Sequence, residues 1–399
     1  MKLLVLNCGS SSLKYQVFNM QDESVLASGR VERIGMEDAI LTHEPAGKEK
    51  IKQVKQILEH KTAILEVLEV LRSKQAGVIQ DFSEISAVGH RIVHGGEDFS
   101  ASVLITPEVM NTITECIDLA PLHNPANILG IEAARESMPD TPQVAVFDTA
   151  FHQTMPKKAF LYPIPMQLYK KYKVRRYGFH GTSHKYVSEK ALEILNIPLE
   201  SSKIISCHIG NGGSVTAILD GKSLDTSMGM TPLEGLMMGT RSGDIDPAAV
   251  LYIMNKEEYT LQDINSMLNK HSGLIGISGI SSDMREIEEG LLNGNENATL
   301  AFDMYEYRIR KYIGAYAAAM NGVDVLIFTA GVGENSPILR KKICENLTYL
   351  GVELDSQANE IFSKSARMVS TPNSKVKVLV IPTNEELVIA RDTQRIVSS

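Results

Sequence analysis

Short apolar runs alternate with glycine, serine and aspartate at the start of the chain. This pattern predicts a three-stranded meander at residues 3–6, 13–18 and 25–31. Apolar residues then recur at steps of three and four from Ile51 to Leu71, and Gly77 stops the pattern, which predicts one long helix. The apolar run 85–92 predicts a further strand.

Two helix starts and a buried strand complete the first half of the chain. Thr106-Pro107 and Asn124-Pro125 each place a capping residue before a proline, the arrangement typical of the first helical position. The continuous apolar run 144–147 predicts a buried strand that ends at Asp148.

The same order of elements recurs in the second half. Strands are predicted at 204–207 and 215–219, and Asp220-Gly221 closes a hairpin into Leu224. A helix over 300–320, a strand over 323–328, a loop over 331–335, a helix capped by Ser336, a strand over 376–381 and a helix from Asn384 follow. Each half therefore reads β-β-β-α-β-α-β-α, which indicates an α/β protein with a duplicated domain.

Composition narrows the classes of partner. The 399 residues are 43% hydrophobic and 22% charged, typical of a globular chain of about two domains. The net charge is −8 and no basic block stands out, so we expect neither a nucleic-acid nor a membrane partner. The first apolar run is too short for a signal peptide, and the four cysteines are dispersed, which favours a cytoplasmic protein.

Three glycine-rich segments are candidates for phosphate binding. Residues 7–14, which include Ser12 and Lys14, join two strands, and 208–214 occupies the equivalent turn of the second half. Small residues let backbone N–H and hydroxyl groups approach an anion, although each turn alone is also compatible with a plain hairpin. Segment 331–335 follows a strand and precedes a helix, so it suits either a nucleotide or an ordinary connection.

Carboxylates and cations lie at the ends of the predicted strands. Asp148 and Glu385 suit a hard cation such as Mg²⁺, although Asp148 also suits a helix cap and Glu385 a first helical turn. Arg91 and Arg241 lie in apolar, glycine-rich segments, where an arginine is either salt-bridged or directed at an anionic substrate. His180, beside a predicted helix start, is a candidate donor to a phosphoryl group or a structural histidine.

Taken together, these motifs resemble the acetate kinase family, within the superfamily of sugar kinases, Hsp70 and actin. The resemblance covers essentially the whole chain and is carried by segments 3–14, 89–96, 147–152, 178–184, 208–221, 231–247, 281–285, 331–335 and 383–386. It implies two duplicated RNase H-like (actin-like ATPase) domains with a nucleotide cleft between them. The implied lobes are 1–148 plus 384–399, on the acetate and metal side, and 149–383, on the nucleotide side.

The resemblance also implies an activity. This is the reversible, Mg²⁺-dependent transfer of the γ-phosphoryl group of ATP to acetate, in line, giving acetyl phosphate and ADP, with Mn²⁺ as a substitute metal and a homodimer as the assembly. Asn7, Asp148 and Glu385 would organise the metal, and Asp148 would be the catalytic carboxylate. Acetate is already ionised and hardly needs a base, so we interpret Asp148 as a metal and positioning residue first.

Further roles follow from the same resemblance. Arg91 would bind the acetate carboxylate, while Arg241 and His180 would stabilise the transferring group. The acetate methyl group would contact Val93, Leu122, Phe179 and Pro232. The nucleotide would contact Ser12, Lys14, His208, Ile209, Gly210, Asn211, Gly212, Asp283, Met284, Arg285, Gly331, Val332, Gly333, Glu334 and Asn335.

Two alternatives stay open at this point. A propionate or butyrate kinase of the same fold differs only in acceptor length, and one methylene group discriminates by only about 1–3 kcal/mol. An actin- or Hsp70-like ATPase would instead use ATP to change conformation around a protein partner. The two glycine-flanked arginines and the absence of residues for an appended partner domain argue against that second alternative.

Overall fold

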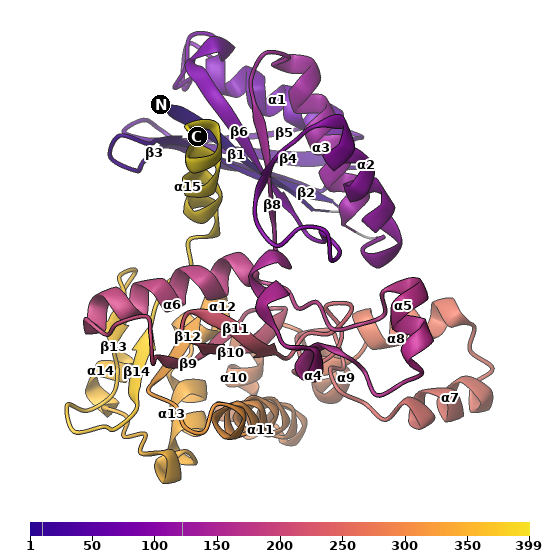
Figure 1. Ribbon diagram of the computed structural model, residues 1–399, viewed down its shortest axis with the longest axis vertical. Helices are drawn as coiled ribbons and strands as arrows, with labels where there is room; N and C mark the ends of the chain where they lie inside the picture. The colour runs from indigo at the N-terminus through magenta and orange to yellow at the C-terminus, as the bar shows by residue number, and fades with distance from the viewer. Residues whose placement is uncertain (10, 122) are drawn as a thin grey trace. The chain divides into compact units, whose positions relative to one another are not determined.

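The computed structural model describes residues 1–9, 11–121 and 123–399, which fold into two compact units (Figure 1). Unit 1 comprises Met1–Ala150 and Asn384–Ser399, and unit 2 comprises Phe151–Thr383. The chain therefore passes from unit 1 to unit 2 once and returns once.

Unit 1 is built on an eight-stranded mixed sheet with the strand order β5-β4-β3-β2-β1-β6-β8-β7. Its strands are β1 Lys2–Cys8, β2 Ser12–Asn19, β3 Ser24–Glu32, β4 Met36–Pro45, β5 Ile51–Ile57, β6 Ile85–Ile92, β7 Val103–Leu104 and β8 Gln143–Phe147. β1 is antiparallel to β2 but parallel to β6, which is parallel to β8. The carboxyl ends of β1, β6 and β8 consequently meet at one edge of the sheet.

Helices cover both faces of this sheet. They are α1 His60–Arg72, α2 Pro107–Glu115, α3 Asn124–Ser137 and α15 Glu385–Val397, with short 3-10 turns at Phe82–Glu84 and Cys116–Leu119. Val88 on β6 packs in the core under α1 and α3. Its neighbour Gly89 faces the opposite side, where an added Cβ would lie 2.4 Å from Thr393 of α15. Because successive strand residues point to opposite faces, α15 covers the face that α1 and α3 leave open.

Unit 2 repeats this plan in a six-stranded sheet ordered β11-β10-β9-β12-β14-β13. The strands are β9 Lys203–Ile209, β10 Gly213–Leu219, β11 Lys222–Thr226, β12 Val325–Thr329, β13 Arg367–Met368 and β14 Lys377–Val380. The order and directions match those of β3-β2-β1-β6-β8-β7 in unit 1. The predicted α/β class and the duplication are confirmed.

The helices of unit 2 include an insertion between β11 and β12. They are α4 Lys157–Phe160, α5 Met166–Tyr172, α6 Gly181–Leu195, α7 Pro247–Lys256, α8 Leu261–Lys270, α9 Gly273–Ser278, α10 Met284–Leu292, α11 Glu296–Ala319, α12 Ala330–Asn335, α13 Pro337–Glu345 and α14 Ser356–Glu360, with 3-10 turns at Ala150–Thr154 and Thr348–Leu350. α11 buries apolar residues in the core of one face of the sheet, and α6 packs in a separate core with Ile204 and Ile327. Within the described residues, no helix is long and apolar enough to cross a membrane.

The last helix of each repeat belongs to the other unit. After β8 the chain enters unit 2, where its long helix α6 packs on β9 and β12. After β14 it returns to unit 1, where α15 packs on β1, β6 and β8. Two chain crossings, at Ala150 and Thr383, are therefore needed to complete both units.

The prediction of one long helix over 51–71 was wrong for its first part. Ile51–Ile57 is strand β5, which pairs with β4, and the helix α1 begins only at His60. The apolar residues Ile51, Val54 and Ile57 fit a helical spacing by chance, and pairing with β4 decides their conformation. Strand β4 itself was not predicted.

Two helix boundaries also differ from expectation. Asn124 lies inside α3 rather than capping it, and its buried side chain bonds to backbone atoms of His94. Segment 331–335 is not an irregular loop, because Ala330–Asn335 forms the short helix α12. The expected caps Thr106 and Ser336 are confirmed, since each side chain accepts a backbone N–H of the following turn. The helix expected from Asn384 is also found, and the Asn384 side chain caps it in the same way.

Candidate active site

In unit 1, four polar side chains meet at the carboxyl ends of the parallel strands. Arg91 lies on β6, Asn7 on β1, Asp148 directly after β8, and Glu385 at the first position of α15. The Arg91 guanidinium donates from Nε to both Asp148 carboxylate oxygens at 3.0 and 3.1 Å, and from Nη2 to Oδ2 at 2.5 Å. Its Nη1 donates to Asn7 Oδ1 at 3.2 Å, and its Nε lies 3.9 Å from Glu385 Oε2.

Asp148 fixes Arg91 without using all of its donors. A guanidinium has five N–H groups, and Asp148 engages Nε and one N–H of Nη2, while Asn7 engages one of Nη1. One N–H on each terminal nitrogen remains for an anion, so the same arginine can hold Asp148 and a second carboxylate. Burial raises the pKa of Asp148, and Arg91 opposes that shift. The buried carboxylate is thus stabilised mainly by this pair.

The oxygen atoms around Arg91 fit a hard divalent cation. Asn7, Asp148 and Glu385 supply amide and carboxylate oxygens, the ligands that Mg²⁺ prefers. Two carboxylates face one guanidinium, and burial and the charge of Glu385 raise the pKa of the neighbouring Glu386. Within residues 1–9, 11–121 and 123–399, no three His, Cys, Asp or Glu side chains form a complete cage. Mg²⁺ commonly takes one or two protein carboxylates and completes its coordination with water and substrate phosphates, and this set of oxygen atoms is compatible with that arrangement.

Other expected residues of unit 1 lie nearby in the fold. Val93 follows β6 and is buried, and its backbone N–H donates to Asn127 Oδ1 at 3.0 Å. Ser12 begins β2, and Lys14, also on β2, lines a small cavity with Glu386. Leu122, expected at the acetate methyl group, lies outside the described residues.

In unit 2, His180 occupies a strained position at the start of α6. Its backbone adopts a left-handed conformation with φ of 58°, which is uncommon for a residue with a side chain and is often found at functional sites. The His180 ring stacks on that of His208, with centroids 4.0 Å apart. Its Nδ1 lies 2.9 Å from Ser214 Oγ on β10.

Arg241, His180 and Gly212 converge on one point. A Cβ built on Gly212 would lie 3.4 Å from Arg241 Nη1 and 4.0 Å from His180 Nε2. Arg241 donates to the Pro232 carbonyl and contacts Met238 Sδ, and it has no carboxylate partner among the residues described. Burial lowers its pKa. A partly buried arginine that lacks a carboxylate is suited to an anionic ligand. Phe179, the neighbour of His180, is buried.

A cavity of about 590 Å³ opens in unit 2 beside this point. Eight of the expected nucleotide residues line it: Gly210, Asn211, Asp283, Met284, Arg285, Gly331, Val332 and Asn335. Ile209 is instead buried in the core, and Gly333 and Glu334 are not among the residues that line the cavity. His208 and Gly212 lie on the His180 and Arg241 side.

Four lining residues were not anticipated: Leu274, Ser282, Glu288 and Ser336. Ser336 was recognised only as a helix cap, and it also donates a hydrogen bond to Glu288. Burial raises the pKa of Glu288, and this hydrogen bond opposes the shift. No motif marks Leu274 or Glu288 in the sequence, because the turns between α8, α9 and α10 bring them to the cavity.

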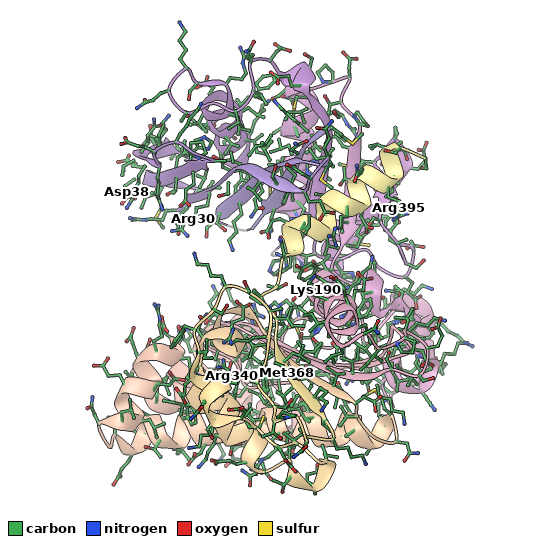
Figure 2. The ribbon with its side chains drawn as sticks, turned by 90° about the vertical axis from the view of Figure 1, so that its left-hand side faces the viewer. Arg30, Asp38, Lys190, Arg340, Met368 and Arg395 are labelled. Carbon is green, nitrogen blue, oxygen red and sulfur yellow. The ribbon has the colours of Figure 1, made fainter. Side chains whose placement is uncertain are left out.

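Arg340, labelled in Figure 2, lies on α13 and contacts the backbone of α12. It is almost fully buried, and its Nη1 donates to the carbonyl oxygens of Gly333 and Glu334 at 2.9 Å each. Nε and Nη2 donate to the side chain and carbonyl of Asn359. Burial lowers the pKa of Arg340 to about 10. The last turn of α12, whose other side lines the cavity, is therefore held by a buried cation.

Comparison with known structures shows the fold class of the protein. The chain has the two-domain actin-like ATPase fold: it superposes on the crystal structure of acetate kinase from Porphyromonas gingivalis with a TM-score of 0.95 and 52% identity, over 99% of both chains. A propionate kinase from Francisella tularensis superposes with a TM-score of 0.92 and 44% identity, also over 99% of both chains.

The family follows from the sequence relatives. The model of the acetokinase family matches residues 2–391. The chain is 60% identical to acetate kinase from Symbiobacterium thermophilum over 397 residues, covering 100% of this chain and 99% of that protein. It is 59% identical to acetate kinase from Thermoanaerobacterium thermosaccharolyticum, with full coverage of both. The chain belongs to the acetokinase family, which confirms the resemblance of its motifs.

Arg340→Met tests whether the buried guanidinium stabilises the turn beside the cavity. The substitution removes the donors of the Gly333 carbonyl oxygen and of the side-chain and carbonyl oxygens of Asn359, and each buried acceptor left without a donor costs about 1–3 kcal/mol. We expect the free energy of unfolding to fall by about 3 kcal/mol or more, measured by denaturant titration. Lys341→Met, at a neighbouring exposed position, should change it by less than about 0.5 kcal/mol. Equal losses in both variants would contradict the supporting role of Arg340.

Proposed function

We propose that this protein transfers the γ-phosphoryl group of ATP reversibly to acetate, giving acetyl phosphate and ADP. Membership of the acetokinase family supports the reaction class. The observation that carries the proposal is the Arg91 guanidinium, held by Asp148 with two N–H groups left over. Such a fork binds a carboxylate through two parallel hydrogen bonds.

The chemical step needs positioning more than covalent help. An oxygen of the acetate carboxylate attacks the γ-phosphorus, the new O–P bond forms, and the bond to the ADP oxygen breaks in line. Acetate is ionised at neutral pH, so no base has to remove a proton. Arg91 orients the acceptor, and Asp148 acts by holding Arg91 and the metal. His180 and Arg241 stabilise charge on the transferring oxygens.

Asn7, Asp148 and Glu385 would hold Mg²⁺, with Mn²⁺ as a substitute. When bound, the cation neutralises charge on the nucleotide phosphates. The nucleotide itself would enter the cavity lined by Gly210, Asn211, Asp283 and the residues of α12. Ser12, Lys14, His208, Gly212, Gly333 and Glu334 complete the proposed nucleotide set, and Ile209, whose side chain is buried in the core, is left out of it.

The length of acid that the protein accepts depends on the space around the methyl group of acetate. Val93 and Phe179 are buried apolar side chains and, with Leu122 and Pro232, would contact the acetate methyl group. A branched side chain at position 93 crowds a longer acid, but a single methylene group costs only about 1–3 kcal/mol. Propionate is therefore expected as a slower substrate.

We also propose that the protein acts in the cytoplasm on small molecules, with neither nucleic acid nor membrane as a partner. All four cysteines, Cys8, Cys116, Cys207 and Cys344, are buried as free thiols. The net charge of −8 disfavours binding to polyanions.

Incubation with Mg-ATP and an acid, followed by trapping with hydroxylamine, tests the reaction. We expect acetohydroxamate to form fastest, propionate to react more slowly, and butyrate to react least. A reaction without acid serves as the control. A faster reaction with a longer acid would favour a propionate or butyrate kinase over an acetate kinase. Loss of ATP without any trapped product would favour a conformational ATPase.

Arg91→Lys tests the proposed acetate partner. Lysine keeps a positive charge beside buried Asp148 but has no planar fork, so acetate loses its paired hydrogen bonds. We expect kcat/KM for acetate to fall by at least about 100-fold, equivalent to roughly 3 kcal/mol, while the KM for ATP changes little. A larger change in the KM for ATP than for acetate would reject this assignment.

A homodimer is the proposed assembly, and α7 supports it. None of its ten residues is buried within the chain, although Val250, Leu251, Ile253 and Met254 are apolar. Leu251 and Tyr252 are 62% and 63% exposed. A helix that displays large apolar side chains on the surface is typical of one covered by another copy.

Leu251→Asp tests this assembly. A charge on α7 would be desolvated in the interface, so we expect a dimeric wild type and a weakened dimer in the variant, measured by light scattering across a dilution series. Val54→Asp on β5 is the matched control, because Val54 is 64% exposed in unit 1. A monomeric wild type would refute the proposal, as would equal dissociation of the control.

A further inference from the structure

A chain of buried histidine and serine side chains runs behind His180. Ser214 Oγ on β10 lies 2.9 Å from His180 Nδ1 and 2.7 Å from His184 Nε2. His184 Nδ1 lies 2.9 Å from Ser206 Oγ on β9. Ser206, His184 and Ser214 are fully buried. These residues connect the core of unit 2 with the imidazole ring that faces Arg241.

The proton positions follow from Ser206, at the inner end of the chain. Its side chain hydrogen-bonds to His184 Nδ1 alone among the residues described. If Ser206 accepted a proton there, its own O–H would be buried without an acceptor, which costs more than an unused lone pair. Ser206 therefore donates its hydrogen to His184 Nδ1.

The remaining positions are then determined step by step. Burial lowers the pKa of His184 well below its ordinary value, with the charges of His152 and His208 adding to the shift, so the ring is neutral. A neutral imidazole that accepts at Nδ1 carries its proton at Nε2, which donates to Ser214 Oγ. The Ser214 hydroxyl hydrogen is left to donate to His180 Nδ1.

We propose that Ser206, His184 and Ser214 are positioning residues that hold His180 as the neutral tautomer with its proton on Nε2. This inference rests on the proposed role of His180 toward the transferring phosphoryl group. Nε2 is the nitrogen that faces Gly212 and Arg241. Held in this way, His180 presents a hydrogen-bond donor to an anionic oxygen, whereas the other tautomer would present a lone pair and repel it.

The ring stacked on His180 is held in the same way. Thr383 Oγ1 donates to Ser183 Oγ at 2.8 Å, and Ser183 Oγ lies 2.8 Å from His208 Nδ1. The Ser183 hydrogen is therefore directed to His208 Nδ1, which places the His208 proton on Nε2 as well. Two separate hydroxyl chains thus set two stacked imidazoles to the same tautomer, and no additional positive charge is placed beside Arg241.

The test combines nitrogen NMR with kinetics on the full-length protein labelled with ¹⁵N-histidine. The His180 signals are assigned by their loss in His180→Gln. In the wild type we expect a protonated Nε2 and an unprotonated Nδ1. In Ser214→Ala we expect a mixture of tautomers and a fall in kcat of at least about 10-fold, smaller than the roughly 100- to 1,000-fold typical of removing a donor outright, with little change in either KM.

Two further variants make the test specific. Ser206→Ala, which does not contact His180, should shift the His180 tautomer in the same direction and serves if Ser214→Ala does not fold. Ser223→Ala is the matched control, because Ser223 is equally buried and bonds to a different histidine, His152 Nδ1, at 2.8 Å. It should leave the His180 signals and kcat unchanged.

A protonated Nδ1 in the wild type would overturn the proposal. So would an unchanged tautomer in both Ser214→Ala and Ser206→Ala, or an equal loss of kcat in Ser223→Ala. The nitrogen signals do not depend on turnover, so a wild type that forms no acetyl phosphate but shows the expected signals would reject the proposed function and leave the tautomer assignment supported.

Discussion

The buried ion pair between Asp148 and Arg91 is the constraint on which unit 1 depends. A carboxylate that is 1% exposed is expensive to desolvate, and removing one partner of such a pair typically costs about 3–5 kcal/mol. The pair forms because β6 and β8 are parallel neighbours whose carboxyl ends meet at the same edge. The geometry that satisfies Asp148 also fixes the direction of the remaining Arg91 donors, so the contact that stabilises the buried carboxylate also orients the donors of the proposed acceptor site.

The two units have sheets with matching strand order and direction, but the side chains at their strand ends differ in charge. In unit 1, oxygen atoms of Asn7, Asp148 and Glu385 lie around the Arg91 guanidinium at the strand ends. In unit 2, the equivalent region collects nitrogen donors, with His180 and Arg241 directed at the space above Gly212. A duplicated scaffold therefore provides one region rich in oxygen atoms, proposed to hold a metal ion, and one rich in N–H donors, proposed to hold an anion.

Much of this arrangement could be predicted from the sequence, and the exceptions have physical causes. Strand runs, proline-marked helix starts and glycine-rich turns are local signals, so β1, β8, α13 and the cavity residue Gly210 were anticipated. Strand β5 was not, because its identity depends on pairing with β4 rather than on its own pattern. Glu288 and Arg340 were missed for a related reason, since their roles arise only when helices distant in sequence pack together.

The exchange of the final helices has a consequence for synthesis on the ribosome. Unit 2 is a continuous stretch of chain, from Phe151 to Thr383, whereas unit 1 begins before it in the sequence but lacks α15 until unit 2 has been made. Until then, the face of β1 and β6 that α15 covers, including the narrow contact at Gly89, stays open to water. Unit 1 emerges before unit 2 but can complete its fold only after it, and Glu385 joins Asn7 and Asp148 only once all of unit 2 has been synthesised.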